Sequence, residues 1–108
     1  MVPSERLLSI LAEPFSYNYL NDIEKTLAVL PPLSPNQRVA VYVVRRTCVE
    51  LCGLLDSIEP TLDRHKAIEK HVLRPLESVV RSIAKFKDVS FEQLASLIQA
   101  SEAARILT

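Results

Sequence analysis

The chain has 108 residues, of which 24% are charged and 48% hydrophobic, and its thirteen lysines and arginines balance thirteen aspartates and glutamates. These values fit one globular domain over residues 1–108, long enough to bury a core of its own. The charge balance excludes a global field that would draw the chain to nucleic acid, and a single glycine excludes glycine-rich phosphate loops and flexible glycine linkers.

The N-terminal residues lack the basic region and apolar stretch of a secretory signal, so none is expected. No apolar run approaches the ~20 residues that a membrane-spanning helix needs. Two cysteines without a secretory signal are typical of a reducing compartment. We therefore expect a cytoplasmic protein, with association to a membrane surface as the alternative.

A short helix is predicted first. Ser4 precedes an apolar stripe of Leu7, Leu8 and Leu11, and Pro14 closes it.

A second helix is predicted to begin at Asn21, because Asn21 and Glu24 have the spacing of a capping box. Pro31-Pro32 ends its apolar stripe, which consists of Leu20, Ile23, Leu27 and Leu30.

The central helix is predicted from about residue 35 to 58. Ser34 supplies the cap, Pro35 the first helical position and Gln37 the third, and Pro60 stops it. One apolar stripe runs along Val41, Val44, Cys48, Leu51, Leu55 and Ile58. A second side carries Val39, Val43 and Leu54. A helix that is apolar on several sides must be surrounded, so we expect its neighbours to enclose it.

A fourth helix is predicted over residues 62–86, and Pro75 interrupts it. Its inward residues are Ile68, Val72, Leu76, Val79, Val80 and Ile83. An interior proline removes a hydrogen bond and costs about 3 kcal/mol, so the pattern predicts a kink or a break at this point.

A last helix is predicted from the capping box Ser90–Gln93, with Phe91, Leu94, Leu97 and Ile98 apolar. Ile106 and Leu107 still require cover, which suggests a piece of a larger protein. The predicted fold is therefore all-α, a four-helix bundle with a short extra N-terminal helix.

Catalytic and metal chemistry find no support in the sequence. Cys48 and Cys52 lie one helical turn apart without the further ligands that a metal site needs, so we interpret them as packing residues. His65 and His71 are six residues apart and share no helical face, and no recognisable nucleophile motif accompanies them. We predict no enzymatic activity, cofactor, metal ion or small-molecule substrate.

The basic residues of the fourth predicted helix follow steps of four, seven and four, which places them along one face: Lys70, Arg74, Arg81 and Lys85. An ordinary solvated face, docking of a partner protein and binding of anionic lipid headgroups all remain open interpretations. Nucleic-acid binding is disfavoured, because no aromatic residues alternate with these bases.

One region resembles a known family. The relevant residues are Arg45-Arg46-Thr47-Cys48, Leu51-Cys52, Leu55, Ile58-Glu59-Pro60 and Leu62, followed by Leu73, Leu76, Val80, Ile83 and Lys85-Phe86, and then by Ser101–Ile106. This pattern is similar to the N-terminal helical domains of mixed lineage kinase domain-like and HeLo-like cell-death proteins, and to a helical region of plant U-box armadillo ligases. It covers about the C-terminal two thirds of the chain and consists mostly of leucine spacings.

The resemblance implies a four-helix bundle in a larger signalling protein. The killing members of that family permeabilise anionic membranes, whereas others act as adaptors. Residues 1–11 of this chain carry no dense basic cluster, which disfavours the killing activity.

The predicted function is a non-enzymatic module for protein–protein interaction, as an adaptor or through oligomerisation. We expect its apolar contact at Leu7, Leu8, Ile106 and Leu107. The alternatives are a membrane-binding or membrane-permeabilising bundle that uses the basic face, and a scaffold fragment without a partner of its own.

Overall fold

The computed structural model describes residues 2–31, 33–57 and 61–107, with the side chains of all of these except His65 and Leu107. All regular elements in these residues are helical, which confirms the all-α prediction. In chain order they are α1 (Pro3–Leu11), α2 (Tyr17–Leu27), α3 (Pro35–Ser57), α4 (Leu62–Ile68), the π-helical segment η1 (Glu69–Leu73), α5 (Arg74–Ala84) and α6 (Phe91–Leu107).

Four helices form a closed ring. α1 contacts α2, α2 contacts α3, α3 contacts α5, and α5 returns to α1. The largest side chains without solvent exposure come from all four of these helices and from α6: Leu7, Ile10, Tyr19, Leu20, Ile23, Val44, Leu51, Leu54, Leu76, Val79, Ile83 and Leu97. Burial of one such leucine or isoleucine contributes about 1.5–3 kcal/mol. The short N-terminal helix is thus a member of the bundle, which explains its apolar stripe.

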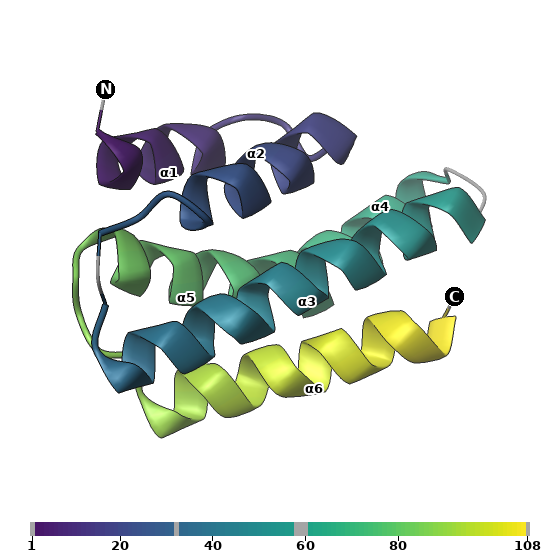
Figure 1. Ribbon diagram of the computed structural model, residues 1–108. Coiled ribbons are helices and arrows are strands. Elements are labelled where there is room, and N and C mark those ends of the chain that lie inside the picture. The colour runs from purple at the N-terminus through teal and green to yellow at the C-terminus, as the bar shows by residue number, and fades with distance from the viewer. Residues whose placement is uncertain (1, 32, 58–60, 108) are drawn as a thin grey trace.

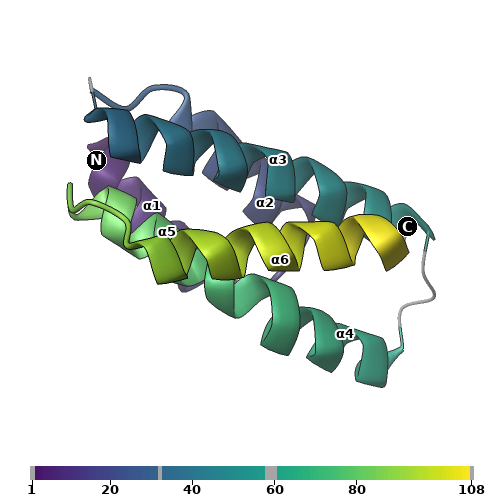
Figure 2. The same ribbon diagram turned by 90° about the horizontal axis from the view of Figure 1, so that it is seen from below.

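The last helix lies outside this ring and runs parallel to α3 (Figures 1 and 2). It packs on α3, α5 and η1. Its inward side is narrow and rich in small residues, with Leu97, Ala100, Ser101 and Ala104 buried. Small side chains let two helix backbones approach closely, so α6 can lie along α3 without a broad apolar face of its own.

The two serine–glutamine capping boxes are present as predicted. Ser34 Oγ accepts from the Gln37 amide at 3.2 Å, and the Ser34 amide donates to Gln37 Oε1 at 3.0 Å. Ser90 and Gln93 make the same reciprocal pair at 3.1 and 2.9 Å. These contacts satisfy amide groups that the first helical turn leaves without partners. Both helix starts are therefore encoded locally.

The start of α3 also holds the connection between α5 and α6. The Asn36 side chain donates from Nδ2 to the Val89 carbonyl at 3.0 Å and accepts from the Val89 amide at 2.7 Å. Gln37 Nε2 donates to the Lys87 carbonyl at 3.2 Å. Two adjacent side chains thus join segments that lie about fifty residues apart in the sequence.

The predicted start of the second helix is wrong. α2 begins at Tyr17, and its cap is Ser16, whose Oγ accepts from the Tyr19 amide at 3.2 Å. Asn21 lies inside the helix. The additional turn buries Tyr19, whose hydroxyl donates to Glu77 Oε1 of α5 at 3.1 Å. Tertiary packing therefore selects the earlier of two suitable caps.

The fourth predicted helix continues through Pro75, but its hydrogen-bond pattern changes to a π-turn directly before the proline. The Arg74 amide donates to the Glu69 carbonyl five residues earlier, which is the hydrogen bond of a π-turn. Proline has no amide hydrogen and clashes with the carbonyl four residues before it. The wider π-turn directly before Pro75 accommodates this conflict while the helix continues into α5.

The segment before the π-turn joins the bundle only at its end, where Ile68 is buried in the core, while the other described side chains of α4 are exposed. Among the described residues, α4 contacts only η1, and Figure 2 shows it diverging from α3 and α6. Leu62 at its start is exposed. The predicted end of the preceding helix depended on Ile58 and Pro60, which lie outside the described residues.

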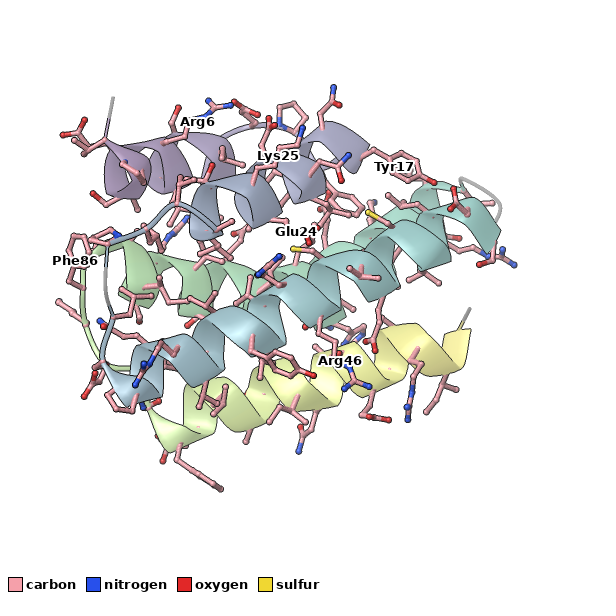
Figure 3. All side chains as sticks on the ribbon, viewed as in Figure 1. Arg6, Tyr17, Glu24, Lys25, Arg46 and Phe86 are labelled. Carbon is pink, nitrogen blue, oxygen red and sulfur yellow. The ribbon has the colours of Figure 1, made fainter. Side chains whose placement is uncertain are left out.

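The end of α5 has an unusual residue in a left-handed conformation. Phe86 has a φ of 56° and projects from one end of the molecule (Figure 3). The Lys87 amide donates to the Ser82 carbonyl at 2.9 Å, and the Phe86 amide donates to the Ile83 carbonyl at 3.0 Å. These two bonds define a Schellman motif, in which glycine usually occupies the position that Phe86 has here.

Candidate interaction surfaces

The predicted basic face is exposed, but its four members do not form one cluster. Lys70 in η1 and Arg74 at the start of α5 line the same two hollows, one of about 490 Å³ and one of about 420 Å³. Arg81 lies further along α5 and Lys85 directly after its end, and neither lines these hollows. In the described part of the chain none of the four forms an ion pair. The structure thus brings together Lys70 and Arg74.

The larger hollow lies between the α1–α2 connection and the π-turn. Three cations line it, Lys66, Lys70 and Arg74, and so do three carboxylates, Glu13, Glu69 and Glu77. The remaining lining residues are Pro14, Phe15, Tyr19 and Leu73. Equal numbers of positive and negative groups leave little net attraction for an anion. This hollow therefore favours no simple anionic ligand.

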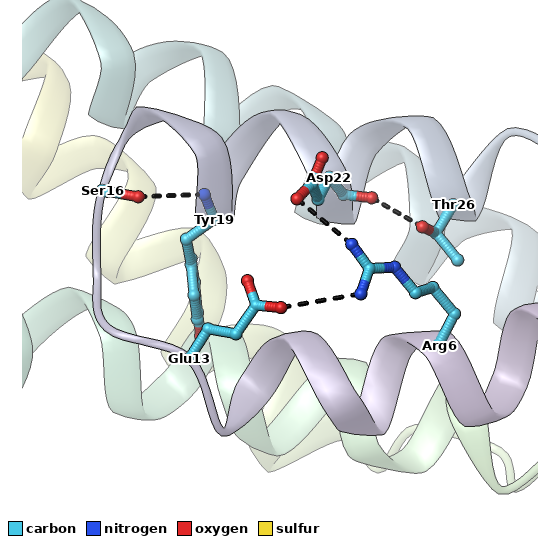
Figure 4. A network of polar contacts seen from close by, with 6 residues as sticks. All are labelled: Arg6, Glu13, Ser16, Tyr19, Asp22 and Thr26. Carbon is cyan, nitrogen blue, oxygen red and sulfur yellow. Dashed lines mark hydrogen bonds and ion pairs between the residues drawn. The ribbon is translucent and has the colours of Figure 1, made fainter.

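Two of its carboxylates already have partners. Glu77 accepts the Tyr19 hydroxyl, and burial, followed by the charge and hydrogen bond of Glu77, raises the pKa of that phenol well above its usual range. Glu13 pairs with Arg6 at 3.5 Å, and Arg6 also reaches Asp22 of α2 at 3.3 Å (Figure 4). The polar groups at this end of the molecule therefore join α1 to α2 and α2 to α5, which is a structural role.

The predicted apolar contact residues do not lie on one surface. Leu7 is fully buried in the ring, so its assignment to a partner contact is wrong: its side chain packs within the domain. Leu8 on α1 is partly exposed and Ile106 on α6 is largely exposed, yet α1 and α6 do not contact each other. The Leu107 side chain lies outside the described residues.

The expectation of an enclosed central helix is wrong on one side. α3 contacts α2, α5 and α6, and these neighbours bury Val44, Leu51 and Leu54. The side between α2 and α6 remains open. There Val39 is 52% exposed, Tyr42 65% and Val49 59%.

These three residues and Arg46 follow steps of three, four and three, so they share one helical face. We call them the α3 stripe. Of the second inward side predicted from the sequence, Val39, Val43 and Leu54, only Val39 belongs to this stripe, while Leu54 is buried and Val43 is partly buried. The sequence alone could not identify which side of α3 lacks a neighbour.

A hollow accompanies the α3 stripe on each side. The α2–α3 groove has a volume of about 350 Å³ and is lined by Glu24, Arg38, Val41, Tyr42, Arg45, Arg46 and Val49. The hollow toward α6 measures about 150 Å³ and is lined by Tyr42, Val43, Arg46, Ile98, Ser101 and Glu102. Tyr42 and Arg46 line both, so they form the ridge between the two hollows; Figure 3 shows Arg46 on the side of α3 that faces α6.

The arginines of the α2–α3 groove differ in their contacts. Arg45 pairs with Glu24 at 3.6 Å and Arg46 with Glu50 at 3.5 Å. The Tyr42 hydroxyl and then the Glu50 carboxylate raise the pKa of the Arg46 guanidinium. Arg38 has no ion pair among the described residues. The groove lining thus holds three cations and one anion.

The two cysteines are free thiols, Cys48 buried and Cys52 half-buried. Burial raises the pKa of Cys48 to about 12, and burial followed by the charge of Asp56 raises the pKa of Cys52. Both thiols are therefore protonated at neutral pH. In the described residues no three histidine, cysteine, aspartate or glutamate side chains are grouped so that they could hold a metal ion. Among the same residues no helix has the length and apolar character to cross a bilayer.

Comparison of the chain with family models, with curated proteins and with solved structures gave no match. The resemblance to mixed lineage kinase domain-like and HeLo-like proteins therefore stays a prediction.

Proposed function

We propose that this domain is a non-enzymatic module for protein–protein interaction within a larger signalling protein, acting as an adaptor or through oligomerisation. The observation that carries the proposal is the α3 stripe. Single exposed apolar residues are common on proteins, but apolar residues that share one face beside concave surface are typical of contact sites.

Tyr42 is the natural anchor of such a contact. Tyrosine is enriched among residues that dominate binding energies, because it offers a large rigid surface and a hydroxyl group. Its ring is exposed and stands between the two hollows. Val39 extends the apolar surface by one turn before Tyr42 and Val49 by two turns after it, which is the length of contact that a docked helix makes.

The proposal can be tested by panning a phage library of random 16-residue peptides against the domain. We expect binders whose affinity falls at least tenfold for Tyr42→Ala, because truncation removes the central anchor. Leu62→Ala is the matched control, since Leu62 is exposed on α4, which does not contact α3 in the described part of the chain. Binders that are insensitive to Tyr42→Ala, or no binders at all, would contradict the proposal.

The oligomerisation version makes a separate prediction. Light scattering over a concentration series should then show a dimer that Tyr42→Ala dissociates and Leu62→Ala does not. A strict monomer at every concentration would leave only the adaptor version.

A second candidate is binding of anionic lipid, and the observation that favours it is that exposed Lys70 and Arg74 form no ion pair with any residue the structure describes. Each cation near a charged membrane contributes about 1 kcal/mol. Three carboxylates line the 490 Å³ hollow beside its three cations and would repel anionic headgroups, so lipid binding is the second candidate. Flotation with phosphatidylserine vesicles tests it: Lys70→Glu with Arg74→Glu should abolish binding, and Arg64→Glu on α4 should not. No flotation of the wild type at low salt would refute it.

A further inference from the structure

We infer that the α2–α3 groove and the α3 stripe receive an acidic amphipathic helix of a partner protein. This inference rests on the proposed function and adds to it the location of the contact and the chemistry of the partner.

The shape of the surface favours a helix. The α3 stripe extends over residues 39–49, a length of about 15 Å at 1.5 Å per residue, which matches about three turns of a partner helix. Hollows lie on both sides of its Tyr42–Arg46 ridge. Ridges of side chains on one helix fit into such grooves on another. A flat bilayer surface would leave these two hollows unfilled. The side chains of a partner helix can fill them, so the shape of the surface favours a helix over a membrane.

The charges favour an acidic partner. The groove lining contains Arg38, Arg45 and Arg46 but only one carboxylate, Glu24. The existing ion pairs of Arg45 and Arg46 are single, long contacts at 3.5–3.6 Å whose arginine side chains are about half exposed. Such pairs contribute little and leave most guanidinium donors unused. A carboxylate on a docked helix could accept two parallel hydrogen bonds from one guanidinium.

Arg38 gives the most specific indication. It lies one turn into α3, close to the positive end of the helix dipole, where a cation is unfavourable. No carboxylate compensates it among the described residues. The Arg38 charge thus has no ion-pair partner in the described part of the chain and is available to an anionic group that approaches the groove.

The same charges argue against a second copy of this chain at this face. A two-fold symmetric contact places the same patch of both molecules against each other. The three groove arginines would then lie opposite an equally basic surface, and juxtaposed like charges oppose binding. A partner of different sequence satisfies the groove, whereas a symmetric dimer does not.

The test uses the full 108-residue chain and a phage library of 18-residue amphipathic peptides. Leucines are fixed at helical spacing on one face, and the flanking positions are random among Glu, Lys, Gln and Ser. Panning at low salt should enrich Glu over Lys at the flanks. For the selected peptides, Arg38→Glu should weaken binding at least tenfold, and Arg64→Glu, the matched charge reversal on α4, should change it less than twofold.

Two further measurements make this result specific. A peptide in which the enriched glutamates are replaced by lysine should bind Arg38→Glu better than the wild type, since the charges are exchanged. Arg38→Glu should also keep or raise the melting temperature, because a carboxylate is favourable near the start of α3. When the melting temperature of Arg38→Glu is kept, unfolding does not explain a loss of binding by this variant.

The possible results separate this inference from the proposed function. Tyr42-dependent binders without a preference for Glu would overturn the acidic partner and leave the interaction module intact. No Tyr42-dependent binder would overturn both. Flotation with anionic vesicles that Arg38→Glu abolishes would assign the surface to a membrane, and a dimer that Arg38→Glu alters would assign it to a second copy; each of these would also overturn the inference.

Discussion

Phe86 allows a direct measurement of backbone strain in this fold. Its φ of 56° is most favourable for glycine, because the Cβ of a residue such as phenylalanine crowds the following carbonyl. Comparison of Phe86→Gly with Phe86→Ala isolates this effect. Both variants lose the same aromatic ring, and they differ only in the Cβ methyl group.

The expected difference follows from two opposing terms. The left-handed conformation costs a residue with a Cβ roughly 1–2 kcal/mol. Glycine loses more conformational entropy on folding, which costs it roughly 0.5–1 kcal/mol. We therefore expect Phe86→Gly to be more stable than Phe86→Ala by about 0.5–1 kcal/mol, or about 2–4 °C in melting temperature for a domain of this size.

The assay is urea unfolding followed by far-ultraviolet circular dichroism. Ala103, exposed within α6, supplies the control, since Ala103→Gly should lose about 1 kcal/mol in the ordinary helical environment. The order of alanine and glycine should thus be opposite at the two sites. A Phe86→Ala variant as stable as Phe86→Gly would refute the idea that the α5 terminus stores strain.

Three further predictions concern other parts of the bundle. Burial raises the pKa of Cys48 to about 12, so the folded state keeps a proton that the unfolded chain releases near pH 9; the free energy of unfolding should decline between about pH 9 and 12, less steeply in Cys48→Ala. Asn36→Ala removes both hydrogen bonds to Val89 and should cost about 1–3 kcal/mol in urea unfolding, whereas Asn36→Asp, which retains the acceptor, should cost less. Amide hydrogen exchange should be faster in α4 than in α5, because Ile68 is the one buried side chain among the described residues of α4; equal protection would contradict this.

The sequence predicts those features of the fold that depend on neighbouring residues. The two serine–glutamine boxes are complete within four residues each, and both helix starts agree with the structure. The start of α2 is different, because Ser16 and Asn21 are both suitable caps. The choice depends on the contact of Tyr19 with Glu77, which lies 58 residues away.

The candidate site is still less accessible to sequence reasoning. Val39 and Val44 are the same residue type on the same helix, yet one is half exposed and the other fully buried. The difference depends on where α2 and α6 lie around α3, which no local pattern encodes. Likewise, the spacing of Lys70, Arg74, Arg81 and Lys85 predicted a common basic face, whereas the hollows of the folded chain include only the first two.

The position of α6 outside the ring bears on the order in which the chain folds. All contacts of the ring are made by residues up to the end of α5, and they join helices that mostly follow one another in sequence. Such local contacts form quickly. During synthesis the extensive contact between α3 and α6 can form only after α6, the last of the described helices, has been made. We therefore expect the ring to assemble first during synthesis and α6 to dock on a nearly finished surface, as a separate and later step.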